Sequence, residues 1–121
     1  MARTARVQYI TRQYMKLNPD TIFLFGDNLL GMGFGGQALE MRGEPNAVGI
    51  PTKKAPGTNE ADYFNDADFD LAKRAIDKAF NSIPAGASII IPIDGLGTGR
   101  AQLPRRAPKI FAYIEQKLSE L

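Results

Sequence analysis

The sequence predicts an α/β protein: a three-layer α/β/α domain around a mixed, mostly parallel central sheet. Three observations indicate this class. The chain has 121 residues, 44% of them hydrophobic and 23% charged, which is typical of one globular domain over residues 1–121. Apolar runs alternate with stretches of helical period, as in parallel sheets covered by helices. Glycine-rich turns follow two of these runs, as in proteins that bind ligands at a sheet edge.

The first part of the chain predicts a short strand, a polar connection and a buried strand. Residues 7–10 are short and β-prone, and residues 12–20 are polar and end in the turn signal Asn18-Pro19-Asp20. Residues 21–25 form a continuous, largely apolar run rich in β-branched and aromatic side chains, so we expect a strand buried on both faces. After a glycine-rich turn, residues 37–42 are compatible with a short helix that Gly43 ends.

A second central strand is expected at residues 47–51, before a long connection. Residues 52–66 are rich in Lys, Pro, Gly, Asn and Asp, a composition typical of a surface loop. A helix should begin with Asp66 or Asp68 as its N-cap, because apolar residues recur after this point with the period of a helix.

The last part of the chain predicts one strand and one helix. The strongest strand of the sequence covers residues 88–93, after the break Pro84-Ala85-Gly86. Apolar residues at helical spacing then indicate an amphipathic helix at the C-terminal end, which should start near Pro104–Pro108.

Glycine carries the strongest functional signal. Seven of the 12 glycines of the chain lie in two windows, residues 31–36 and 95–99, each between a predicted central strand and a helix. Ligands of open α/β sheets bind at this edge, and glycine backbone N–H groups, aided by the positive end of the following helix, can converge on an anion. We therefore predict a cradle for two linked phosphates, with these ligand-binding residues: Gly26, Gly31, Gly33, Phe34, Gly35, Gly36, Gln37, Lys53, Gly95, Leu96, Gly97, Thr98, Gly99 and Arg100.

Three polar residues at the same edge are catalytic candidates. Asp27 and Asn28 end the first central strand, and Asp94 ends the last one. Such side chains can bind a ribose hydroxyl or act as a general acid or base, and they can equally cap a turn. Lys53 and Arg100 could neutralise a diphosphate.

Composition excludes several kinds of chemistry. The chain contains neither Cys nor His, which rules out thiol nucleophiles, iron–sulfur clusters and imidazole acid–base schemes. No metal and no cofactor are expected. The formal net charge of +2 does not favour a nucleic-acid partner, and no apolar stretch is long enough for a membrane span. A cytoplasmic location is the default expectation.

The two glycine loops resemble those of macro domains, the ADP-ribose-binding α/β modules. The resemblance rests on Phe25-Gly26-Asp27-Asn28 through Gly36-Gln37-Ala38, and on the hydrophobic strand with a proline that leads into Asp94-Gly95-Leu96-Gly97-Thr98-Gly99. It is closer to short, phage- or bacterial-type members than to standard macro domains. It implies a macro-like fold with a cleft that holds an ADP-ribose-like nucleotide, free or attached to a macromolecule, with Asn28 near the distal ribose and Gln37 where some hydrolases place an acid.

Three hypotheses about function follow. The first is a domain that binds ADP-ribose or a related nucleotide, with or without hydrolysis of an ADP-ribosyl linkage assisted by Asp27 or Asp94. The second is a non-catalytic protein that sequesters a nucleotide signal, which the absence of His and Cys favours slightly. The third is a phosphatase or transferase acting on another phosphorylated sugar or nucleotide.

Overall fold

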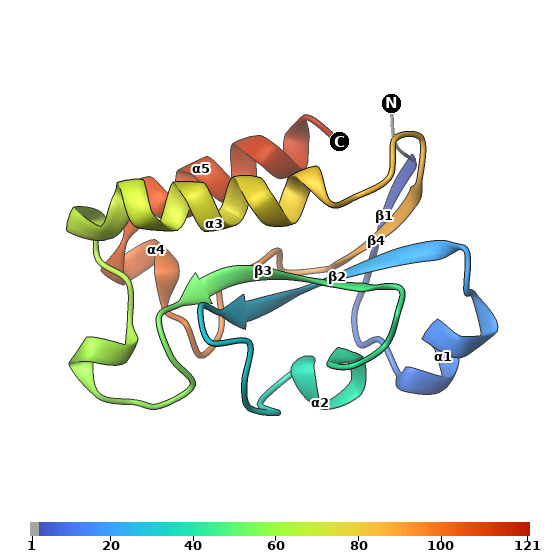
Figure 1. Ribbon diagram of the computed structural model, residues 1–121, viewed down its shortest axis with the longest axis horizontal. Coiled ribbons are helices and arrows are strands. Elements are labelled where there is room, and N and C mark those ends of the chain that lie inside the picture. The colour runs from blue at the N-terminus through green and yellow to red at the C-terminus, as the bar shows by residue number, and fades with distance from the viewer. Residues whose placement is uncertain (1–2) are drawn as a thin grey trace.

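The computed structural model describes residues 3–121, which form an all-parallel sheet with helices on both faces (Figure 1). The strands lie in the order β1-β4-β2-β3, and each pair of neighbours is parallel. Parallel neighbours need crossover connections, which explains why helices separate the strands along the chain. The strands are β1 (Arg3–Val7), β2 (Thr21–Asn28), β3 (Ala47–Lys53) and β4 (Ser88–Pro92).

Helices form a layer on each side of this sheet. The longer helices, α3 (Phe69–Asn81) and α5 (Pro108–Ser119), lie on one face, while α1 (Arg12–Leu17) and α2 (Ala38–Met41) lie on the other (Figure 1). The short helix α4 (Leu103–Arg106) precedes α5, and the 3₁₀ turns η1 (Glu60–Asp62) and η2 (Asp66–Asp68) precede α3. Within residues 3–121, no helix is long and apolar enough to cross a membrane.

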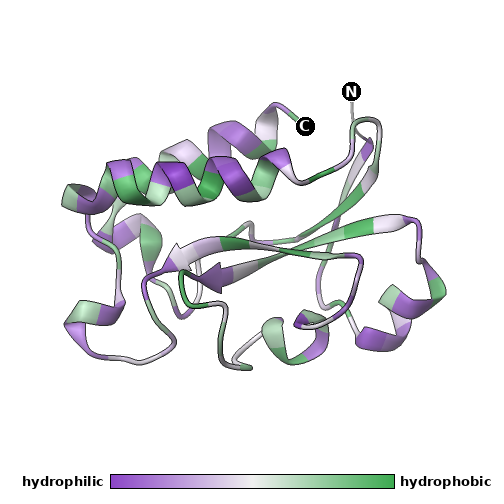
Figure 2. Ribbon diagram, in the orientation of Figure 1, coloured by the Kyte–Doolittle hydropathy of each residue, from purple (hydrophilic) through white to green (hydrophobic). Residues whose placement is uncertain are grey.

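The strand residues alternate between two hydrophobic cores. Leu24, Ile89 and Ile91 pack with α3 and α5, whereas Phe23 and Phe25 pack with α1 and α2. Successive side chains of a strand point to opposite faces, so a strand covered on both sides needs apolar residues at every position. The continuous apolar runs in β2 and β4, green in Figure 2, therefore reflect burial on both faces of the sheet.

The structure confirms an α/β protein and corrects the details of the sheet. The sheet was expected to be mixed, but its described strands are all parallel. The first strand covers residues 3–7, not residues 7–10. Residues 3–6 are exposed on an edge strand, so they show no apolar run, and it is pairing with β4 that makes them a strand. Ile10 is buried but lies in the following connection.

The segment expected to be only a polar connection contains the helix α1. Thr11 caps this helix, because its hydroxyl accepts a hydrogen bond from the backbone N–H of Tyr14. Met15 is the one fully buried residue of α1, so the segment shows too few apolar residues for a helical period. Thr11 was the available signal, since threonine is a favoured N-cap.

The remaining elements agree with the sequence within a few residues. β2 continues past residue 25 to Asn28, and β3 continues to Lys53, because these ends pair with each other. The helix α3 begins after Asp68, one of its two proposed N-caps. The predicted C-terminal helix is divided at Ala107 into α4 and α5.

Candidate functional site

A cleft of about 480 Å³ lies at the carboxyl ends of the strands and is lined by both glycine-rich segments. We call residues 29–37, between β2 and α2, loop 1, and residues 93–102, between β4 and α4, loop 2. β2 and β4 are neighbours in the sheet, which brings the two loops together. Both glycine windows reach one cleft, as expected, except that Gly31 at the start of the first window lies outside its lining.

Glycine is required at specific points of both loops. Gly33 in loop 1 has φ +88°, and Gly97 in loop 2 has φ +83°, a backbone region that residues with a Cβ avoid. A Cβ at Gly97 would lie 2.8 Å from Leu103 Cδ2, and Leu103 is fully buried. Gly97 is therefore needed both for its conformation and for close packing against α4.

The helices that follow the loops contribute little to an anion site. α2 and α4 have four residues each, too few for the aligned peptide dipoles of a long helix. The expected help from positive helix ends is therefore not supported, and any attraction for an anion must come from the loops themselves.

The loops contain consecutive backbone N–H groups without a protein partner. Among the described residues, no acceptor lies within hydrogen-bond reach of the N–H groups of residues 33–37 or of residues 96–101. All of these residues line the cleft. Backbone donors without partners are rare when buried and are otherwise satisfied by water or by a ligand. Successive free N–H groups in glycine loops are the arrangement that binds anions.

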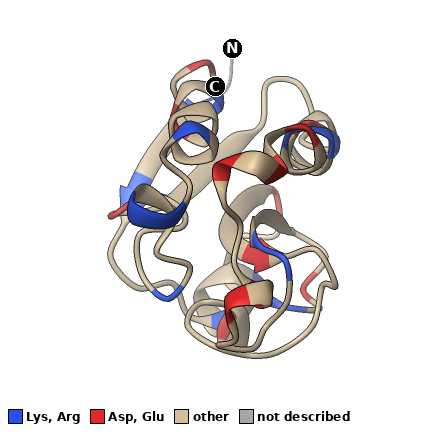
Figure 3. Cartoon of the chain, turned by 90° about the vertical axis from the view of Figure 1, so that its left-hand side faces the viewer, with Lys and Arg blue, Asp and Glu red and all other residues tan. Residues whose placement is uncertain are grey.

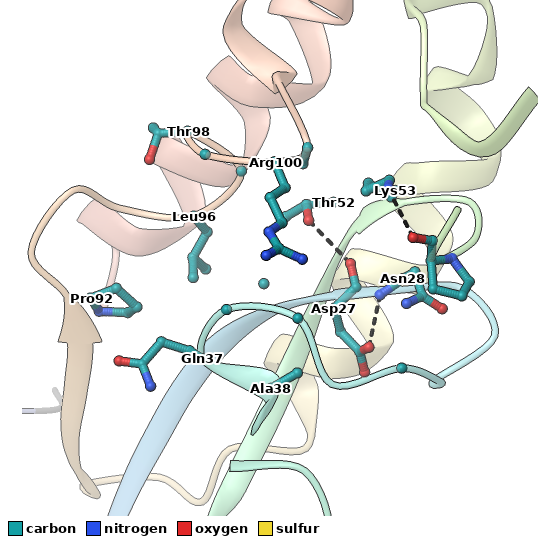
Figure 4. Close-up of a pocket in the computed structure, with 18 of the residues that line it drawn as sticks. Asp27, Asn28, Gln37, Ala38, Thr52, Lys53, Pro92, Leu96, Thr98 and Arg100 are labelled. Carbon is teal, nitrogen blue, oxygen red and sulfur yellow. Dashed lines mark hydrogen bonds between the residues drawn. The ribbon is translucent and has the colours of Figure 1, made fainter. Parts of the chain in front are cut away.

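Arg100 connects the two loops across the cleft. Its side chain extends from loop 2 toward loop 1 (Figure 4), where a Cβ at Gly35 would lie 2.5 Å from Nη1. The absence of a side chain at Gly35 therefore leaves room for the guanidinium. Within residues 3–121, the Arg100 guanidinium has no hydrogen bond and no ion pair. It is thus an exposed cation whose donors remain available to a ligand.

Lys53 adds positive charge at the rim of the cleft, but its ammonium group is held by the chain. Nζ donates to Gly57 O at 2.5 Å and lies 4.5 Å from the centroid of the Tyr63 ring. Burial has the largest effect on the pKa of Lys53 and lowers it. The negative charge of Asp62 raises this pKa, while the positive charges of Arg100 and Arg106 lower it. Figure 3 shows basic and acidic segments interspersed over this end of the molecule.

The side chains of Asp27 and Asn28 are already engaged in shaping loop 1. Asp27 forms an ion pair with Arg42, with 2.5 Å between Oδ1 and Nη2. Asn28 Nδ2 donates to Met32 O at 2.8 Å, and Asn28 Oδ1 accepts from the N–H of Leu30. This geometry favours the turn-capping interpretation of both residues over direct contact with a substrate.

Asp94 differs from Asp27 because its carboxylate is exposed and has no hydrogen-bond or ion-pair partner among residues 3–121. The backbone carbonyl of Asp94 accepts a hydrogen bond from the Thr98 hydroxyl at 3.2 Å, which closes loop 2. Phe34 is 61% exposed and lines the cleft. Loop 2 therefore presents the carboxylate of Asp94 to the cleft, and loop 1 presents the exposed ring of Phe34.

The side chains of two further predicted ligand-binding residues contact other parts of the chain and do not point freely into the cleft. Gln37 pairs with the backbone of Ile10: Oε1 accepts from Ile10 N at 2.8 Å, and Nε2 donates to Ile10 O at 2.9 Å. Leu96 is buried in the core beneath loop 2. Both residues line the cleft, but only their backbone groups are free to serve a ligand.

Of the remaining glycines predicted to bind a ligand, Gly31 lies earlier in loop 1 and does not line the cleft, whereas the others do. Those that do are Gly26, Gly35, Gly36, Gly95 and Gly99. The sequence interpretation missed Arg42, which appeared only as the end of a helix, and Thr52, whose hydroxyl donates to Asp27 O at 3.1 Å. No local pattern marks these partners, since they meet only when β2 and β3 pair and α2 packs on β2.

Over the described part of the chain, no group of acidic side chains could hold a metal ion.

The fold and the cleft define an α/β protein with a glycine-lined cleft at the carboxyl edge of a parallel sheet. The chain belongs to a family of unknown function (DUF7831), whose model matches residues 5–117. Comparison with curated proteins gives no match, and neither does comparison with solved structures.

The identification as a macro domain is therefore wrong. The matching family is a different one, with no function assigned, and nothing points to a macro domain. The resemblance rested on glycine loops after parallel strands. Any α/β protein that brings backbone N–H groups to this sheet edge needs such loops, so they do not establish common membership in a family.

Proposed function

We propose that this protein binds a nucleotide with two linked phosphates, such as ADP-ribose, in the cleft between loops 1 and 2. The observation that carries the proposal is the set of backbone N–H groups of residues 33–37 and 96–101, which line one cleft and have no acceptor in the described part of the chain. Arg100 supports it, because its guanidinium lies between the loops and has no partner among residues 3–121. Donors on both sides of the cleft suit a ligand with more than one anionic group.

Size and shape also support a nucleotide over a simple anion. A volume of about 480 Å³ falls within the range of roughly 300–1,000 Å³ that holds small organic ligands. The exposed ring of Phe34 offers a face on which a base could stack. An inorganic phosphate would use only a fraction of this space.

Calorimetry with ADP-ribose, ADP, pyrophosphate and phosphate tests the proposal. We expect the nucleotides and pyrophosphate to bind more tightly than phosphate, because they reach both loops. Arg100→Gln should weaken binding of ADP-ribose by about 10- to 100-fold, since a hydrogen bond to a charged group contributes about 1.5–3 kcal/mol. Arg74→Gln is the matched control, because Arg74 is exposed on α3, outside the cleft. Absence of heat and of a thermal shift with all four compounds would refute the proposal.

The free carboxylate of Asp94 favours hydrolysis as a second candidate function. A carboxylate in a cleft can orient or activate a water molecule, and Asp94 has no competing partner among residues 3–121. Asp27 is less suited, because Arg42 binds both of its oxygens. Turnover of an ADP-ribosyl substrate that is lost in Asp94→Asn, with binding retained, would support hydrolysis. Binding without turnover over hours would leave a sequestering protein.

A further inference from the structure

Arg42, at the end of α2, binds two consecutive carbonyl groups of loop 1. Its Nε donates to Gly33 O at 2.7 Å, and its Nη2 donates to Met32 O at 3.2 Å. Both carbonyls therefore face the same guanidinium. The positive φ of Gly33 permits this arrangement, which a residue with a side chain would resist.

The guanidinium of Arg42 is itself fixed from the side of the sheet. Asp27 accepts from Nη2 at 2.5 Å and from Nη1 at 3.2 Å, and the Phe25 ring lies 5.6 Å from Cζ. The side chains of Arg42 and Asp27 are only 16% and 14% exposed. Bidentate pairing with a carboxylate fixes the orientation of a guanidinium as well as its distance. Because Asp27 belongs to β2, Arg42 holds loop 1 in a fixed position relative to this strand.

The direction of the carbonyls decides the direction of the N–H groups. A peptide unit is planar and trans, so its N–H points opposite to its C=O. The carbonyls of Met32 and Gly33 share peptide units with the N–H groups of Gly33 and Phe34. Because both carbonyls point to Arg42, both N–H groups point away from it, and neither has an acceptor among residues 3–121. Two successive N–H groups on one side of the chain form an anion-binding concavity.

We infer that Arg42 is a positioning residue that orients the Gly33 and Phe34 N–H groups of loop 1 to bind one anionic group of the ligand. This inference rests on the proposed function, since it names the part of the cleft that loop 1 contributes. Loop 2 with Arg100 forms the other part, and Arg42 has no hydrogen bond to any residue of loop 2. Loss of Arg42 therefore affects loop 1 selectively.

Amide NMR titration with pyrophosphate separates the two loops. In the wild-type protein, the N–H signals of Gly33 and Phe34 and those of Thr98 and Gly99 should all shift as pyrophosphate is added. In Arg42→Gln, the loop 2 signals should still shift, the loop 1 signals should not, and affinity should fall at least tenfold. Arg42→Lys should behave in the same way, because a single ammonium nitrogen cannot reproduce the planar, spread geometry in which Nε, Nη1 and Nη2 of Arg42 bind Asp27 and the two carbonyls.

The possible outcomes distinguish this inference from the proposed function. If neither loop of the wild-type protein responds, both fail. If only loop 2 responds, the inference fails and an anion cleft remains. If both loops lose their response equally in Arg42→Gln, Arg42 has only a general structural role, and the inference is overturned. Asp27→Asn is the second variant should Arg42→Gln not fold, with the same selective loss expected. Ile114→Val, a change in the core beneath α5, controls for lowered stability.

Discussion

Two glycines of loop 2 that are only two positions apart should respond to alanine in opposite ways. Gly97 has φ +83°, and its substitution by alanine places a side chain in the left-handed region, at a cost of about 1–2 kcal/mol. The new Cβ would lie 2.8 Å from Leu103 Cδ2 and 2.9 Å from Leu103 Cβ. Because Leu103 is fully buried, this overlap adds about 1–3 kcal/mol. Gly97→Ala should therefore destabilise the protein by about 2–5 kcal/mol.

Gly99 provides the matched comparison. A Cβ at Gly99 meets no atom of residues 3–121 within 4 Å, and the φ of Gly99 is not in the positive region. Gly99→Ala should leave stability unchanged or raise it by about 0.4–1 kcal/mol, because alanine restricts the unfolded chain. Urea denaturation followed by far-ultraviolet circular dichroism measures both variants. Equal stability of the two variants would show that neither the backbone conformation of Gly97 nor its contact with Leu103 is as described.

Two other substitutions test contacts that support the fold. Gln37→Glu should destabilise the protein by about 1–3 kcal/mol in urea denaturation, because it removes the Nε2 donor that now binds the carbonyl of Ile10. Unchanged stability would contradict the pairing of Gln37 with this backbone. Hydrogen bonds from Tyr113 and Lys73 hold the pKa of Asp77 below its ordinary value of 3.8, so its contribution to stability is present at neutral pH and is lost as the pH falls through the lowered pKa. Asp77→Asn should therefore lower the melting temperature at pH 7, and this loss should become smaller as the pH falls below the ordinary pKa of 3.8; a loss that does not change with pH would contradict this role of the ionised carboxylate.

The central strands could be predicted because their signal is local. β2 and β4 are covered on both faces, so nearly every residue between 21 and 25 and between 88 and 91 is apolar. β1 gave no such signal, because its residues 3–6 are exposed at the edge of the sheet. Its partner β4 lies more than 80 residues away in the chain, and no pattern of neighbouring residues indicates a pairing with so distant a segment.

The candidate site shows the same division. Both glycine loops could be placed from the sequence, because strand, turn and helix follow one another along the chain. The roles of Asp27 and Gln37 could not, because each side chain meets a partner from another element: Arg42 for Asp27 and Ile10 for Gln37. Asp27 was a catalytic candidate that could equally cap a turn, and Gln37 was expected to bind a ligand; both line the cleft, and the side chains of both bond to other parts of the chain.

The sequence by itself determined that apolar strands alternate with helices and that glycine loops follow β2 and β4. These features depend on side-chain polarity and on the backbone freedom of glycine, which are properties of neighbouring residues. Only the tertiary structure decided that β1 lies beside β4, that Arg42 binds Asp27 and loop 1, and that Arg100 reaches from loop 2 to Gly35 of loop 1. The physical reason is that these contacts join residues far apart in the chain, so they exist only once the sheet has brought them together.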